Sequence, residues 1–107
     1  MVHQMRLEKE FFDQIKNGIK TIEVRINDEK RRRIEVGDEI EFLKRPDFKE
    51  KQKTRVVNLI KKKTLLKVFE EIPANLLGEV DRENLYKLYT KEEEKKWGVV
   101  AIQIEKI

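Results

Sequence analysis

The sequence predicts a single α+β domain over residues 1–107, built around a small, partly open β-barrel. Five segments are predicted strands, and four of them alternate between apolar and polar residues, which is typical of strands with one buried face. Helical spacing of apolar residues follows the first of these segments and returns before the last. Of the 107 residues, 43% are charged and 38% are hydrophobic, so we expect one modest core beneath a densely charged surface.

The first two predicted strands flank a helix. Residues 2–7 alternate, and residues 8–17 then follow helical spacing. Gly18 ends this helix, because glycine takes the left-handed conformation without a Cβ clash. Residues 20–27 alternate most clearly of all, with three branched apolar side chains on one face. The polar side chains expected on the other face are Thr21, Glu23, Arg25 and Asn27.

The middle of the chain predicts two further strands separated by charged loops. Residues 28–33 form a charged loop, and Ile40 and Phe42 point inward from the third strand. Residues 44–53 combine a proline with many charges, which predicts an exposed hairpin loop. Residues 54–61 are the fourth strand, with apolar residues on both faces.

Short helices precede the last strand. Thr64 is placed to cap the first of them, and Asp81 the second. Thr90 and Glu93 have the spacing of a capping box, which predicts a third helix. The last strand covers residues 99–107.

Positive charge is concentrated in the middle of the chain. The net charge is +4, but residues 30–63 hold 13 Lys and Arg against 6 Asp and Glu. Such a patch attracts phosphate groups. The alternative is a solvated surface that keeps a small protein soluble.

Several classes of function are disfavoured. The chain has no cysteine and one histidine, His3, which argues against the usual zinc sites and against disulfides, so we expect neither a metal nor a cofactor. No apolar stretch approaches the roughly 20 residues that cross a membrane, and the N-terminus lacks the pattern of a signal peptide. We therefore expect a cytoplasmic protein without a membrane partner, and we favour a monomer.

The segment from Gly18 to Arg25 places an ammonium, a carboxylate and a guanidinium close together. Glu23 and Arg25 share a strand face, about 7 Å apart. A carboxylate beside Lys20 can act as a base or accept from the amino group of a nucleobase, and a guanidinium suits phosphate or guanine. The alternative is a surface salt-bridge network, which contributes little to stability.

The whole chain resembles the ASCH family. The resemblance starts from the pattern G-x-K-x-x-E-x-R, read here as Gly18, Lys20, Glu23 and Arg25. It extends to the start His3-x-Met5-x-Leu7, to Asp28-Glu29-Lys30-Arg31-Arg32, to Val36-Gly37-Asp38-x-Ile40-x-Phe42, to Tyr89 through Glu92 and to Trp97-Gly98-Val99-Val100.

This resemblance implies a PUA-like mixed β-barrel of five to six strands, with one helix after the first strand, short helices before the last, and a cleft lined by the Gly18–Arg25 segment. The family is associated with RNA metabolism. One branch hydrolyses acetylcytidine with a Lys–Thr–Glu set of catalytic residues, and another member is reported as a ribonuclease.

The catalytic set of the acetylcytidine hydrolases is only partly matched in this sequence. Its lysine falls on Lys20, but its threonine falls on Glu23, and a carboxylate cannot replace that hydroxyl without a change of mechanism. Its glutamate could correspond to Glu70, Glu71 or Glu79.

Three functions follow from these residues. The first is an RNA- or nucleotide-binding module, in which Glu23 reads a base while Lys20 and Arg25 hold phosphate. The further contacts expected are Arg31, Arg32, Tyr89 and His3, although a hydrogen-bonded core position suits His3 better and the aromatic residues are more typical of core. The second is a hydrolase of RNA or a modified cytidine nucleoside, with Lys20 and Glu23 as its acid/base pair. The third, a protein-interaction adaptor, is weaker because no large apolar stripe is left over.

Overall fold

The structure of the protein is a computed structural model, which describes residues 1–78 and 90–107. The strands are β1 (Val2–Leu7), β2 (Ile22–Ile26), β3 (Glu39–Lys44), β4 (Lys51–Lys62) and β5 (Val99–Lys106). The helices are α1 (Lys9–Lys16), α2 (Glu29–Arg32), α3 (Leu65–Glu71), α4 (Ala74–Leu77) and α6 (Lys91–Trp97).

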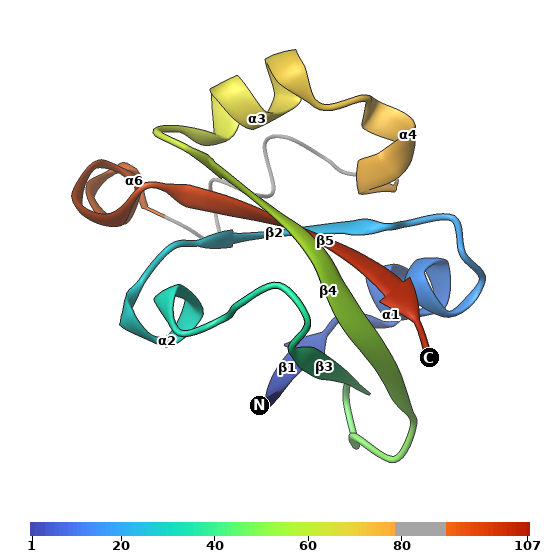
Figure 1. Ribbon diagram of the computed structural model, residues 1–107. Helices are drawn as coiled ribbons and strands as arrows, with labels where there is room; N and C mark the ends of the chain where they lie inside the picture. Colours follow the sequence, from blue (N-terminus) through green and yellow to red (C-terminus); the bar gives the residue numbers. More distant parts are fainter. Residues whose placement is uncertain (79–89) are drawn as a thin grey trace.

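The five strands form one curled sheet that closes into a half-barrel, as Figure 1 shows, and this confirms the predicted α+β class. Their order in the sheet is β1-β3-β4-β5-β2, so β1 and β2 are the two edges. Only the β1–β3 pair is parallel. We call the gap between the edges β1 and β2 the seam. Helices α3 and α4 cover the top of the sheet in Figure 1, and none of the described helices has the length and apolarity needed to span a bilayer.

Two apolar clusters fill the interior. The first joins α1 to β1, β3, β4 and β5, and the second joins β2 and β5 to α3 and α4. Strand β5 contributes alternate residues to each cluster, so both of its faces are buried. Strand β2 is also covered on both faces. Its apolar face packs in the second cluster. On its other face, Glu23 and Arg25 lie opposite Ile102 and Val100 of the first cluster in the β2–β5 ladder. The polar face of β2 therefore turns toward the interior rather than toward water.

The predicted loops are shorter than expected. Residues 28–33 contain helix α2, because Asp28 caps it by accepting a hydrogen bond from the backbone N–H of Arg31 at 3.1 Å. The predicted hairpin loop 44–53 is shorter in the structure, because β3 extends to Lys44 and β4 begins at Lys51, which pairs with Leu43 in the β3–β4 ladder. The charged side chains at the start of β4 do not prevent strand pairing there, because alternate side chains along the strand point outward.

The predicted helix caps at Thr64 and Thr90 are confirmed. Thr64 accepts from the backbone of Lys67 at 3.2 Å, and Thr90 forms the complete capping box with Glu93. Helix α4 was not predicted, and the helix that Asp81 was expected to cap lies outside the described residues.

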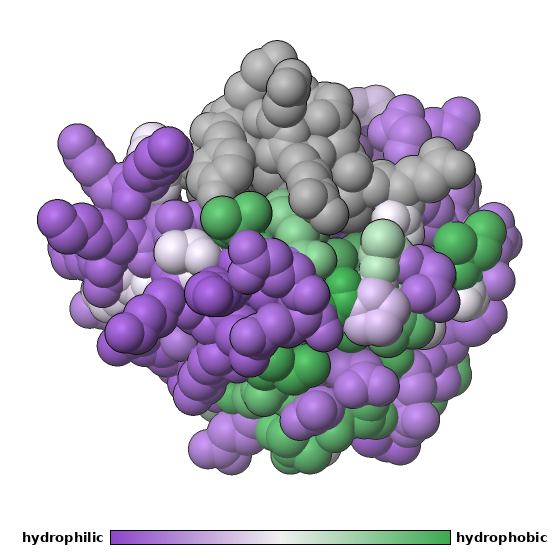
Figure 2. Space-filling view, turned by 90° about the horizontal axis from the view of Figure 1, so that it is seen from above, coloured by the Kyte–Doolittle hydropathy of each residue, from purple (hydrophilic) through white to green (hydrophobic). Residues whose placement is uncertain are grey.

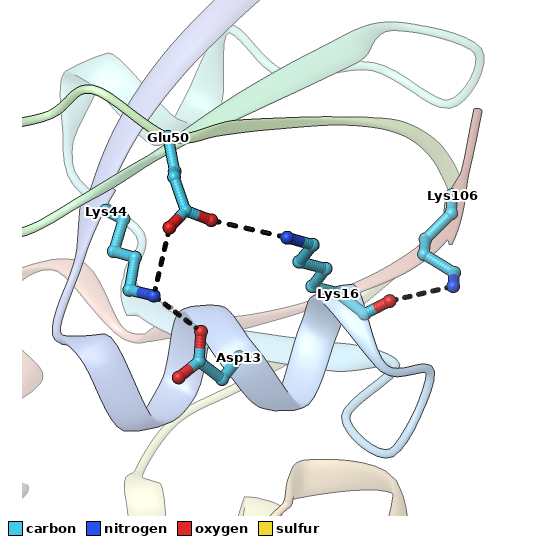
Figure 3. Close-up of polar contacts among 5 residues, drawn as sticks. All are labelled: Asp13, Lys16, Lys44, Glu50 and Lys106. Atoms are coloured by element: carbon cyan, nitrogen blue, oxygen red, sulfur yellow. Dashed lines mark hydrogen bonds and ion pairs between the residues drawn. The ribbon is translucent and has the colours of Figure 1, made fainter.

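A polar network fastens α1 to the end of the half-barrel (Figure 3). Lys44 donates to Asp13 at 2.9 Å and to Glu50 at 3.5 Å, and Glu50 also accepts from Lys16 at 3.3 Å. Lys106 donates to the carbonyl oxygen of Lys16 at 2.8 Å. The hydrogen bond to Asp13 raises the pKa of Lys44, and the hydrogen bond from Lys16 lowers the pKa of Glu50. The charges of Lys16 and Lys44 are thus compensated within the protein.

Candidate functional site

The polar face of β2 and the turn before it carry a chain of three alternating charges. Nζ of Lys20 lies 3.4 Å from Oε1 of Glu23, and Nη2 of Arg25 lies 2.9 Å from Oε2. Nε of Arg25 donates to that same oxygen at 2.9 Å. The exposed side-chain fractions of Lys20, Glu23 and Arg25 are 4%, 8% and 15%. The structure brings the three predicted residues together, with the ammonium and the carboxylate inside the protein and the guanidinium nearest the surface.

The ammonium of Lys20 contacts three oxygen atoms and one aromatic ring. It donates to the carbonyl oxygens of Ile22 at 2.6 Å and of Leu77 at 2.8 Å, besides its contact with Glu23. The ring centroid of Phe11 lies 5.7 Å from Nζ. An ammonium has three protons to donate, and these three oxygens match them.

Burial and charge pairing act in opposite directions on this chain. Burial lowers the pKa of Lys20, although the carboxylate of Glu23 opposes that shift. Burial by itself would raise the pKa of Glu23, but the charges and hydrogen bonds of Arg25 and Lys20 outweigh it and hold this pKa below its usual value. Glu23 is therefore ionised at neutral pH, as a buried carboxylate between two cations.

Gly78 allows the end of α4 to lie close to the turn before β2. Thr21 donates its backbone N–H to the carbonyl of Leu76 at 3.0 Å, next to the contact between Lys20 and Leu77. Gly78 has φ 77° and ψ −167°, a conformation that is essentially confined to glycine. A Cβ atom there would lie 2.1 Å from Oε1 of Gln14 and 3.2 Å from Cβ of Lys20. The sequence gave no indication that Gly78 would have this role.

Replacement of Gly78 by alanine is expected to lower the free energy of unfolding by about 2–3 kcal/mol, from backbone strain and the displacement of Gln14. Gly18 is the control: it also has a positive φ, of 78°, but a Cβ atom at this position would have no neighbour within 4 Å, so Gly18→Ala should lose only about 1 kcal/mol. Urea unfolding of both variants measures the difference. Equal losses would show that the close approach at Gly78 adds nothing.

A cationic hollow of about 440 Å³ opens at the seam, where the ion chain ends. We call it the seam hollow. Its lining comes from both edge strands, from α2 and from the end of β3: Gln4, Met5, Arg6, Arg25, Lys30, Arg31, Leu43 and Arg45. Arg25 crosses the seam, because its Nη2 donates to the carbonyl oxygen of Arg6 at 3.0 Å. Five of the eight described lining residues are cations and none of these eight is an acid, so the hollow suits an anion.

The positive charge of the seam hollow is only partly neutralised. Arg25 pairs with Glu23, Arg31 with Asp28 at 3.4 Å, and Arg45 with Glu8 at 3.3 Å. For Arg6 and Lys30, the described residues supply no carboxylate partner. In addition, Nε of Arg31 is buried without a hydrogen-bond partner within the same residues. Two unpaired cations and one unused donor thus remain for a ligand.

Two other predicted contacts have protein partners. Arg32 does not line the seam hollow: its Nε donates to the carbonyl of Asn27 at 2.8 Å, and its guanidinium lies 5.1 Å from the ring centroid of Trp97. His3 is hydrogen-bonded to Asp38 at 2.8 Å, and this bond is the largest cause that lowers the pKa of Asp38 to about 2.

The remaining predicted residues are distributed elsewhere. Tyr89 and Glu79 lie outside the described residues. Glu70 and Glu71 are exposed on α3, where they pair with Lys67 and Lys62. Among residues 1–78 and 90–107, no three His, Asp or Glu side chains are grouped to hold a metal ion.

The sequence did not single out several residues that line the seam hollow. Lys30 and Arg45 belong to basic clusters visible in the sequence, but Arg6 and Gln4 sit on the alternating first strand as ordinary surface residues. Their place at the site depends on β1 being a sheet edge opposite β2, and a single sequence does not reveal strand order.

Known proteins resemble this chain along its whole length. The family model described as the ASCH domain matches residues 5–107. Hypothetical protein PH0355 is 35% identical with a TM-score of 0.85, and the match covers 100% of both chains. Protein PF0455 from Pyrococcus furiosus is 37% identical with a TM-score of 0.77, over 100% of this chain and 98% of that one.

A more distant match shows the fold alone. A mutant of ZmASCH from Zymomonas mobilis shares 13% identity with a TM-score of 0.72, over 97% of this chain and 67% of that one. The comparison with curated proteins gave no significant match. The family model nevertheless covers nearly every residue, which confirms the resemblance expected from the sequence. The chain belongs to the ASCH domain family.

Proposed function

We propose that this protein binds RNA or a nucleotide, with a phosphate group held in the seam hollow. The observation that supports this most is the lining itself, whose described residues include five cations and no acid. Guanidinium groups bind phosphate through paired N–H donors, and Arg6 on β1, Arg31 on α2 and Arg45 in the turn after β3 provide them. Glu23 is committed to Lys20 and Arg25, so in this proposal it positions Arg25 instead of reading a base.

Binding of single-stranded RNA tests this function. The variant Arg6→Gln/Lys30→Gln removes the two seam cations that lack a carboxylate partner, and its affinity for an RNA of about ten nucleotides should fall about tenfold at low salt. The slope of log Kd against log salt should decrease by about 1.4, because two phosphate contacts are lost. Fluorescence anisotropy of labelled RNA over a salt series provides both values.

The matched control is Lys16→Gln/Lys53→Gln. It removes the same charge from two exposed residues that line none of the hollows, and Lys16 is already paired with Glu50. This control should bind RNA like the wild type. If the wild type binds no RNA or nucleotide at low salt, or if both double variants weaken binding equally, the proposal is wrong.

The second candidate is a hydrolase that uses Lys20 and Glu23. One observation favours it: burial lowers the pKa of Lys20, as is common for catalytic lysines. The two hydrogen bonds of Lys20 and its ion pair with Glu23 weigh against it, because they leave no proton directed at a substrate. Incubation of the wild type with RNA and with acetylcytidine, in the same buffers as the binding assay, would detect turnover if this candidate is correct.

A further inference from the structure

A second basic hollow lies between the end of β4 and α6. It has a volume of about 620 Å³, and we call it the lysine hollow. The residues of its lining that matter here are Asn27, Lys61, Lys62, Lys63, Lys95 and Trp97. Among the residues that the structure describes, Glu94 is the one acid of this lining; it is 8% exposed and already accepts a hydrogen bond from the backbone of Leu65 at 3.0 Å.

Most of the positive charge of the lysine hollow is uncompensated. Lys62 pairs with Glu71, whereas Lys61, Lys63 and Lys95 have no ion pair within the described part of the chain. In Figure 2, the side of the molecule that carries α6 is covered almost entirely by hydrophilic side chains, and apolar patches lie nearer the middle and the opposite side. This hollow therefore suits an anionic partner.

Asn27 gives an independent indication that the lysine hollow takes a polar occupant. The residue is 8% exposed, and its backbone N–H donates to the carbonyl of Gly98 at 3.0 Å, which fixes its position. Its side-chain oxygen is buried without a hydrogen-bond partner among the described residues. Buried polar atoms are normally paired, so an unpaired one beside a hollow indicates a place for a water or a ligand.

A third hollow, beside α2, has lining residues in common with both of these hollows. It has a volume of about 610 Å³, and it shares Lys30 and Arg31 with the seam hollow and Trp97 with the lysine hollow. Two carboxylates, of Asp28 and Glu29, are part of its lining. The path is thus strongly positive at both ends, and mixed in charge beside an indole ring in the middle.

We propose that a single strand of RNA follows this path, from the seam hollow over α2 into the lysine hollow. Phosphates occupy the two cationic ends, and sugars or base edges pass Trp97, where Lys30, Arg31 and Arg33 are largely offset by the two carboxylates. Charged tracks with aromatic contacts are typical of proteins that bind single strands. The inference depends on the proposed function and specifies its ligand: a strand long enough to reach both ends binds better than a single nucleotide.

Binding along this path can be followed by tryptophan fluorescence, because Trp97 is the only tryptophan of the chain and lines both the middle hollow and the lysine hollow. An RNA of about ten nucleotides should change its fluorescence. In Lys61→Gln/Lys63→Gln, the affinity for this RNA should fall about tenfold, and the salt slope should decrease by about 1.4. A dinucleotide with a 5′-phosphate should bind the wild type and this variant equally.

The control Lys16→Gln/Lys53→Gln separates a local effect from a loss of overall charge, and it should bind the longer RNA like the wild type. If Lys61→Gln/Lys63→Gln binds that RNA as tightly as the wild type while Arg6→Gln/Lys30→Gln binds it more weakly, the strand is confined to the seam hollow. That result overturns the inference and leaves the proposed function intact. Failure of the wild type to bind either RNA would remove both.

Discussion

Replacement of Glu23 by glutamine is expected to destabilise the fold by about 3–5 kcal/mol, although the two side chains have nearly the same shape. The glutamine leaves the buried ammonium of Lys20 without its counter-charge, and Arg25 loses the partner of two of its N–H groups. Both cations were removed from water on folding, and a buried charge without compensation is strongly unfavourable. Urea or thermal unfolding of the purified variant measures the loss.

A double variant tests whether the loss comes from the ion pair. Lys20→Met/Glu23→Gln removes the ammonium together with the carboxylate, and buried pairs replaced as a unit are often tolerated. We expect the double variant to be more stable than the sum of the single losses predicts, by at least about 1 kcal/mol. Additive losses, or a Glu23→Gln protein as stable as the wild type, would mean that the pairing is not what stabilises this region.

The same carboxylate makes stability depend on pH. The pKa of Glu23 is lower in the folded protein than the ordinary glutamate value of 4.5 that it takes in the unfolded chain. Between those two values the unfolded chain binds more protons, so the contribution of Glu23 is complete above pH 4.5 and is lost as the pH falls through the folded-state pKa. In Glu23→Gln this part of the acid sensitivity should disappear, which unfolding curves measured from neutral pH downward would detect.

The sequence was least informative about the burial of Glu23. Alternation along residues 20–27 predicted the strand, and β2 confirms it. It also placed Glu23 and Asn27 on the polar face opposite the apolar one, yet both are buried. The reason is tertiary: α3 and α4 cover the apolar face of β2, while its polar face lies beside Ile102 and Val100 of the first cluster. Alternation identifies two faces but not what covers each of them.

Local signals were more reliable. The caps at Thr64 and Thr90 depend on a few neighbouring residues, so the sequence contains all that is needed to predict them. The hollows depend on contacts between elements far apart in the chain: Arg6 reaches Arg25 only because β1 and β2 are the two sheet edges. The closeness of Lys20, Glu23 and Arg25 was therefore predictable and Arg31 was among the expected contacts, whereas the place of Arg6 beside them was not.

Arg25 links the buried ion chain to the seam hollow, so its replacement should affect stability and binding together. Arg25→Ala deprives Glu23 of one of its two cationic partners and removes the hydrogen bond to the carbonyl of Arg6 across the seam. We expect a loss of about 3 kcal/mol in the free energy of unfolding and an RNA affinity about tenfold lower. Calorimetry and fluorescence anisotropy on the same sample measure the two effects.

Arg25→Lys separates the two roles. A lysine retains the charge, but it cannot donate to Glu23 and to the carbonyl of Arg6 in the fixed geometry of a guanidinium. Its stability should lie between those of Arg25→Ala and the wild type, and its salt slope should match the wild type because the charge is kept. Arg55→Ala, an exposed change on β4, is the control for charge alone and should alter neither property strongly. If Arg25→Ala unfolds like the wild type but binds RNA more weakly, Arg25 serves the ligand alone, and the buried chain does not support the site.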